Sequence, residues 1–84
     1  MEVIDAFYKP DTIDCFTIVF DEQSPINPYY YTMLALSRYA VAFSQFTEGY
    51  YEPGTLNEHL GSRVMFDELD DRIKDHVRDR LAYE

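Results

Sequence analysis

The pattern of apolar and polar residues predicts β-strands in the first half of the chain. Residues 3–8 are a first candidate strand, which ends at Lys9-Pro10-Asp11 because proline cannot donate to a ladder and restricts the residue before it. Residues 15–20 form a second, in which Phe16, Ile18 and Phe20 share one face and aromatic and β-branched residues dominate. Residues 11–14 between them are expected to form a hairpin loop.

Two further strands are predicted after a proline-containing loop at residues 21–28. If residues 29–36 form a strand, alternate residues lie on one face: Tyr30, Thr32, Leu34 and Leu36. A helix also fits, with a different shared face: Tyr30, Met33, Leu34 and Tyr39. The strand is preferred, because three tyrosines followed by threonine are poor helix openers. Residues 37–41 would then be a turn and residues 42–48 a fourth strand.

A short turn-and-helix segment is expected next. Residues 52–55, Glu-Pro-Gly-Thr, have the proline and glycine that a type II turn requires. Thr55 and Glu58 match a capping box, in which each side chain would bond the other residue's amide. Gly61 could end that short helix in the left-handed conformation. Residues 63–66 are expected to be extended.

The C-terminal segment predicts an amphipathic helix. Leu69, Ile73, Val77 and Leu81 recur every four residues, and His76 adjoins this stripe. Acidic residues before the helix and Arg78 and Arg80 near its end complement the helix dipole. Two ion pairs are expected at i, i+4 spacing: Glu68 with Arg72 and Asp70 with Lys74. The predicted fold is α+β, a single domain over residues 1–84, with an antiparallel sheet of about four strands and the helix packed on one face.

Charge narrows the class of partner. Sixteen Asp and Glu stand against seven Lys and Arg among 84 residues, a net charge of −9 with neutral histidines. Residues 1–62 hold nine acids and two bases, and residues 63–84 hold seven acids and five bases, so the predicted sheet carries most of the excess. Nonspecific binding to nucleic acid or to an anionic membrane needs cationic contacts, so direct binding to either is not expected. A basic protein surface is the expected partner.

The N-terminal residues and the single cysteine favour a cytoplasmic protein. Residues 1–5 lack the basic region and apolar run of a signal peptide, and no apolar stretch approaches the roughly 20 residues that span a bilayer. One cysteine cannot form an internal disulfide, which favours a reducing compartment.

The sequence suggests no enzyme, cofactor or metal site. Cys15 could be a nucleophile with His59 or His76, but it lies in an apolar strand and is expected to pack in the core. The acids at residues 67, 68, 70 and 71 have neither the glycine nor the spacing of a calcium loop, so they are interpreted as a charged first helical turn.

Tyrosines and acids together suggest a partner-binding surface. Six tyrosines fall at strand ends and loops: Tyr29, Tyr30, Tyr31, Tyr39, Tyr50 and Tyr51. Such rings can cap a thin core with their hydroxyls in water, or they can anchor an interface. Acids spread over a sheet can also imitate the phosphate spacing of nucleic acid and compete for a Lys/Arg groove. The expected partner-binding residues are Asp21, Glu22, Glu48, Glu52, Tyr30 and Tyr50.

Four stretches of the sequence carry a resemblance to a known class. These are residues 60–69 (LGSRVMFDEL) with His76-Val77 and Arg80-Leu81, and residues 43–49 (FSQFTEG). Together with the size and acidity, they resemble small proteins of phages and mobile elements, of the anti-CRISPR inhibitor type. The resemblance implies an inhibitor that acts in the host-cell cytoplasm and blocks a nucleic-acid-binding surface of an RNA-guided nuclease complex. The alternative is a regulatory or adaptor protein of a mobile element whose acidity serves only solubility.

Overall fold

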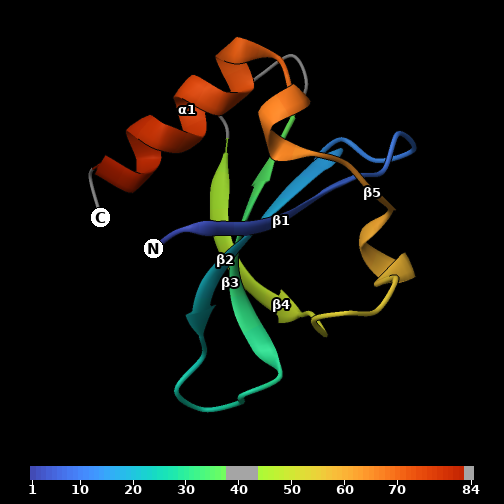
Figure 1. Cartoon of the computed structure of the whole chain (residues 1–84), viewed down its shortest axis with the longest axis vertical. Helices are drawn as coiled ribbons and strands as arrows, with labels where there is room; N and C mark the ends of the chain where they lie inside the picture. Colours follow the sequence, from blue (N-terminus) through green and yellow to red (C-terminus); the bar gives the residue numbers. More distant parts are fainter. Residues whose placement is uncertain (38–43, 83–84) are drawn as a thin grey trace.

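The computed structural model describes residues 1–37 and 44–82, and it confirms the α+β class. A five-stranded antiparallel sheet has the order β4-β3-β2-β1-β5, and the C-terminal helix α1 lies toward one end of it (Figure 1). The elements are β1 Val3–Tyr8, β2 Phe16–Gln23, β3 Tyr30–Leu36, β4 Gln45–Tyr50, the 3₁₀ turn η2 Glu58–Leu60, β5 Ser62–Arg63, the 3₁₀ turn η3 Phe66–Glu68 and α1 Asp71–Ala82.

The first two strands lie where the sequence predicts them. β1 has the predicted bounds, and Phe16, Ile18 and Phe20 of β2 are buried together on one face. β2 continues beyond Phe20 to Gln23, because main-chain pairing extends past the apolar residues: the Asp21 N–H donates to the Glu2 carbonyl at 3.0 Å. Irregularities in the ladder lie between Val3 and Asp5 and between Val19 and Gln23.

The segment that admitted two interpretations is a strand. Leu34 of β3 pairs with Ile18 of β2 and with Phe46 of β4, so the helical alternative is wrong. β4 runs to Tyr50, beyond the predicted end at Glu48. Its predicted beginning at residues 42–43, and residues 38–41 of the predicted turn, lie outside the described residues.

The helix packs on one face of the sheet, as predicted. Ile73 and Val77 are buried in a cluster with Phe16, Ile18, Phe20, Leu34 and Leu36, and Leu69 and Leu81 are partly buried against it. Leu69 precedes the helix and ends η3. Asp70 caps α1: its carboxylate accepts the Arg72 N–H at 2.8 Å, and its carbonyl accepts the Ile73 and Lys74 amides.

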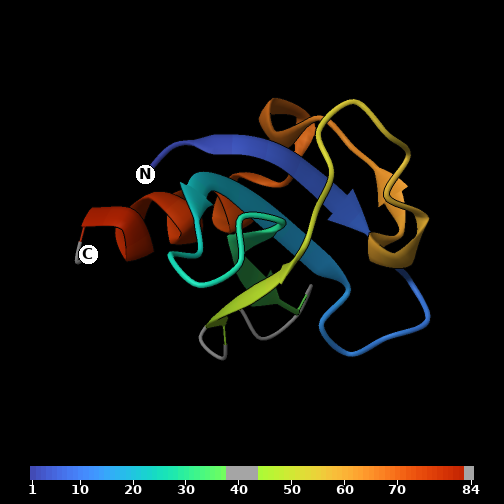
Figure 2. The same cartoon turned by 90° about the horizontal axis from the view of Figure 1, so that it is seen from below.

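The other face of the sheet has a cover that the sequence pattern did not predict. Phe7, Val19, Met33 and Tyr51 form a second buried cluster, with Leu60 packed against it. Tyr51 and Leu60 come from the segment after β4, which lies on the opposite side of the molecule from α1 in Figure 2. The thin core is therefore enclosed by the helix on one face and by residues 51–60 on the other.

The turn in that segment is confirmed, but the capping box is wrong. Thr55 N–H donates to the Glu52 carbonyl at 3.3 Å, and Gly54 has the positive φ of +83° that the turn requires. The Thr55 hydroxyl donates to the same carbonyl at 2.9 Å rather than capping a helix. Asn57 instead precedes η2, in the left-handed region, and its amide bridges the N–H and C=O of Glu52. The side chain that organises the loop is thus the asparagine.

Gly61 has the expected positive φ, +105°, but its ψ of −156° places it outside the left-handed helical region. A Cβ at this position would lie 2.5 Å from the Tyr8 carbonyl oxygen, so the chain needs glycine for the close approach of β5 to β1.

The region between Gly61 and α1 differs from its prediction in two respects. Arg63 is extended in β5, but Phe66 begins η3. The two predicted i, i+4 ion pairs are not formed. Glu68 belongs to η3 and not to the helix, and Arg72 pairs instead with Asp70 at 3.7 Å, while Lys74 pairs with Asp71 at 3.3 Å.

Among the described residues, no helix combines the length and apolar character that crossing a membrane requires.

Candidate partner-binding surface

The structure places all six predicted partner-binding residues toward one end of the sheet. β2 and β4 end there and β3 begins there, because neighbouring strands are antiparallel. Tyr30 and Tyr50 are directly paired across β3 and β4, and Glu48 is paired with Thr32. In Figure 1 this end lies at the bottom, around the loop between β2 and β3, and α1 lies at the top. We call the following group the acidic sheet end: Asp21, Glu22, Tyr29, Tyr30, Glu48, Tyr50 and Glu52.

The tyrosines divide into exposed and buried members. Tyr29, Tyr30 and Tyr50 are 65%, 40% and 44% exposed, whereas Tyr51 is 5% exposed and belongs to the core. Tyr51 therefore packs in the core, whereas an interface role stays a prediction for the three exposed tyrosines; Tyr39 lies outside the described residues. Ile26, in the adjoining loop, is 92% exposed. The acidic sheet end thus carries large rings and an aliphatic side chain in solvent.

The carboxylates at this end differ in how they are held. Asp21 accepts the Glu2 N–H at 2.9 Å, and Glu52 accepts the Tyr50 hydroxyl at 3.1 Å. That hydrogen bond, followed by the negative charge of Glu52, raises the pKa of Tyr50 above its usual value. Glu22 and Glu48 are exposed side chains on β2 and β4. Asp21 therefore also anchors residue 2, whereas the exposed carboxylates of Glu22 and Glu48 form no hydrogen bond or ion pair with the residues that the structure describes.

The described cations are held by partners outside the acidic sheet end. Four are on α1: Arg72, Lys74, Arg78 and Arg80. Arg63 on β5 pairs with Asp5 at 2.9 Å. Lys9 follows β1 at the opposite end of the sheet, and its ammonium donates to the His59 carbonyl at 3.4 Å. Among residues 1–37 and 44–82, the ion pairs of Lys and Arg are with Asp5, Asp70, Asp71 and Asp75, and none is with a carboxylate of the acidic sheet end.

A shallow cavity of about 300 Å³ adjoins this end. Tyr29, Tyr31 and Tyr51 line it together with Glu52 and Pro53. The rings of Tyr31 and Tyr51 meet edge to face, with centroids 5.2 Å apart. A cavity lined by aromatic rings and by an acidic residue is suited to a side chain with an apolar stem and a cationic head, such as lysine or arginine.

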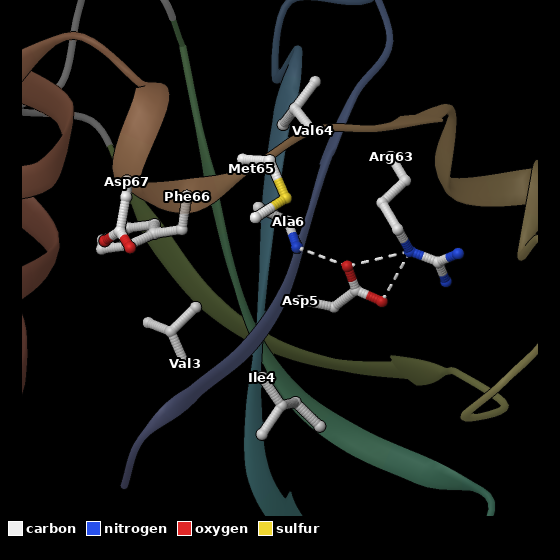
Figure 3. Close-up of a pocket in the computed structure, with 9 residues that line it drawn as sticks. All are labelled: Val3, Ile4, Asp5, Ala6, Arg63, Val64, Met65, Phe66 and Asp67. Carbon is white, nitrogen blue, oxygen red and sulfur yellow. Dashed lines mark hydrogen bonds and ion pairs between the residues drawn. The ribbon is translucent and has the colours of Figure 1, made fainter.

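A second cavity, of about 250 Å³, lies between β1 and residues 63–67 (Figure 3). Figure 3 shows Asp5 and Arg63 pointing toward each other on one side, and Val3 and Phe66 on the other. The Asp5 carboxylate accepts from Arg63 Nε at 2.9 Å and from the Tyr51 hydroxyl at 2.8 Å. It also accepts the Ala6 N–H at 3.0 Å. Since these bonds join β1, β5 and the loop after β4, the group has a structural role, which no local sequence signal indicates.

The residues considered for catalysis have other surroundings. Cys15 is buried among apolar side chains, as expected. Nε2 of His76 contacts the Ser44 hydroxyl, and Nε2 of His59 lies 2.7 Å from the Tyr50 carbonyl oxygen. The contacts shown for both imidazoles are thus to partners other than the thiol. In the described part of the chain, no group of three or more His, Cys, Asp or Glu could hold a metal ion.

No protein-family model, curated protein or solved structure matches the chain.

Proposed function

We propose that the protein is a non-catalytic binding protein that attaches to a basic protein surface through the acidic sheet end. The observation that carries this proposal is the convergence, at one end of the sheet, of exposed tyrosines and of carboxylates that form no ion pair with a described Lys or Arg. Sequence spacing alone would allow these residues to be scattered. Their convergence joins the two features that an interface needs, a charged field and apolar anchors.

The two kinds of residue have different tasks in this proposal. Exposed carboxylates such as Glu22 and Glu48 attract a cationic partner and accelerate association, because their negative charges add to a field of one sign. Tyr30 and Tyr50 supply large contact area with few rotatable bonds, so they hold the partner once it has docked. The cavity beside Tyr29 and Glu52 receives a lysine or arginine side chain.

The partner class that the sequence resemblance implies is an RNA-guided nuclease complex. Such a complex holds nucleic acid in a positively charged channel. Carboxylates on the sheet would pair with the Lys and Arg side chains that otherwise contact phosphates. The protein would then act as a competitive inhibitor. The support for this choice is the charge of the acidic sheet end together with the anti-CRISPR resemblance.

The test is binding to purified RNA-guided nuclease complexes, followed by surface plasmon resonance with and without target DNA. The proposal predicts that bound DNA prevents attachment and that added salt weakens it, since exposed charges are screened beyond roughly 8–10 Å at physiological ionic strength. Tyr30→Ala should speed dissociation, with Ile13→Ala as the control: Ile13 is also exposed, but lies in the loop at the opposite end of the sheet. Simultaneous full-strength binding of DNA and this protein contradicts the proposal.

The alternative function is that of a regulatory or adaptor protein whose acidity serves only solubility. It differs in one measurable respect: affinity for its partner would not depend on the acids of the sheet end more than on acids elsewhere. A salt-independent complex would favour this alternative.

A further inference from the structure

The outer edge of β4 is an open strand edge next to the acidic sheet end. In the described part of the chain, β4 pairs with β3 on one side and with no strand on the other. The side chains on both of its faces are partly or largely exposed. An open edge presents main-chain donors and acceptors that can pair with another chain.

The hydrogen-bond pattern shows which residues of β4 face outward. Tyr51 N–H donates to the Tyr29 carbonyl, so this pair is hydrogen-bonded across the ladder. Pairs alternate along an antiparallel ladder, which directs the N–H and C=O of Phe46, Glu48 and Tyr50 away from β3. One further contact agrees: the Tyr50 carbonyl is met by His59 Nε2 at 2.7 Å. The imidazole therefore covers the last outward carbonyl, while the outward groups of Phe46 and Glu48 remain beyond its reach.

We propose that β4 takes up an extended basic segment of the partner as an added strand, which pairs with the outward groups of Phe46 and Glu48. This inference rests on the proposed function, because it specifies how the basic partner is held. Main-chain hydrogen bonds supply affinity in such strand addition, and alternate side chains supply specificity.

The charges on β4 select the occupant. Glu48 lies within the edge and is exposed, and Glu52 follows the strand. A residue opposite Glu48 on an added strand has its Cβ about 5 Å away, so arginine or lysine there is favoured and an acid is disfavoured. A second copy of this chain would bring its own Glu48 and a net charge of −9 to the same edge. Glu48 thus opposes self-pairing, as charged residues on natural edge strands do, and favours a basic strand.

The experiment uses the full chain and two synthetic peptides of about eight residues, a usual strand length. One alternates arginine and valine. The other has the same sequence with alternate amides N-methylated, which keeps its charge but prevents strand pairing. Hydrogen exchange of individual amides is measured by NMR, and affinity by calorimetry.

The expected result is position-specific. The first peptide should slow exchange at the outward amides of Phe46 and Glu48, and should leave Thr47 and Gly49, which already face β3, nearly unchanged. The N-methylated peptide should bind at least about tenfold more weakly. Glu48→Pro should weaken binding of the first peptide more than Glu48→Gln does, because proline also removes the outward donor while keeping the β3 ladder.

The contradictory outcomes separate the two proposals. Equal, salt-dependent binding of both peptides without slowed exchange overturns strand addition and leaves the proposed function standing. Binding of neither peptide overturns both. A dimer that forms without peptide and protects Phe46 and Glu48 also overturns the inference, since the occupant is then a second copy. If Glu48→Pro does not fold, the N-methylated peptide still decides the question.

Discussion

Replacement of Tyr51 by phenylalanine tests the bonds that hold the segment after β4 to the sheet. The Tyr51 side chain is buried, and its hydroxyl donates to Asp5 at 2.8 Å. Loss of a hydrogen bond to a charged, largely buried carboxylate costs about 1.5–3 kcal/mol. Because Asp5 keeps its bonds to Arg63 and to the Ala6 amide, and the ring contacts stay, the lower part of that range is expected.

The neighbouring residue gives a matched control. Tyr50 also donates its hydroxyl to a carboxylate, that of Glu52, but this pair is exposed. Tyr50→Phe should therefore change the free energy of unfolding much less than Tyr51→Phe does. Urea unfolding of the two variants measures both values. Equal losses in Tyr51→Phe and Tyr50→Phe would refute the argument that burial of the Asp5 bond sets its value.

The same pair gives a pH dependence. Burial first, and then the hydrogen bond to Asp5, raises the pKa of Tyr51 from 10.0 to about 12. A raised folded-state pKa means that the stabilising contribution is fully present below pH 10 and is lost as pH rises toward about 12. The stability difference between the native chain and Tyr51→Phe should accordingly shrink over that interval. A constant difference would show that Tyr51 ionises alike in the folded and unfolded chain.

Five further substitutions test the packing of the fold and the role of Cys15. Ile73→Ala should lower the free energy of unfolding by about 2–5 kcal/mol, and Leu81→Ala by less, because Ile73 is buried and Leu81 only partly so. An unchanged melting temperature for both variants would mean that α1 is not docked as described. Gly61→Ala should destabilise the chain more than Gly54→Ala, since both have positive φ but only Gly61 lacks room for a Cβ; equal melting temperatures would contradict this. Cys15→Ser should leave partner binding intact in the folded protein, whereas loss of binding with native stability would overturn the packing role of Cys15.

The elements that local patterns specify could be predicted from the sequence. The alternation of Phe16, Ile18 and Phe20 reflects a strand with one buried face, and the spacing of Ile73 and Val77 reflects a helix on that face. Strand ends were less predictable, because β2 and β4 continue through polar residues that pair only by their main chains.

Features that depend on distant contacts could not be read from local patterns. Asp5 meets Tyr51 and Arg63, which are 46 and 58 positions away, and neither spacing carries a periodic signal. The capping-box motif at Thr55 and Glu58 was misleading, since Asn57 could bridge both main-chain groups of Glu52 instead. Likewise, composition indicates exposed tyrosines and acids, but only the register of β3 with β4 places Tyr30 beside Tyr50.

The most direct measurement compares two charge-reversed variants in their association with an RNA-guided nuclease complex that binds the native chain. One carries Glu48→Lys and Glu52→Lys at the acidic sheet end, and the other carries Asp75→Lys and Asp79→Lys on the exposed side of α1. Both change the net charge equally. The account predicts that the first slows association by about tenfold or more at low salt, while the second stays near the native rate. Equal association rates for the two variants would contradict a binding role for the acidic sheet end.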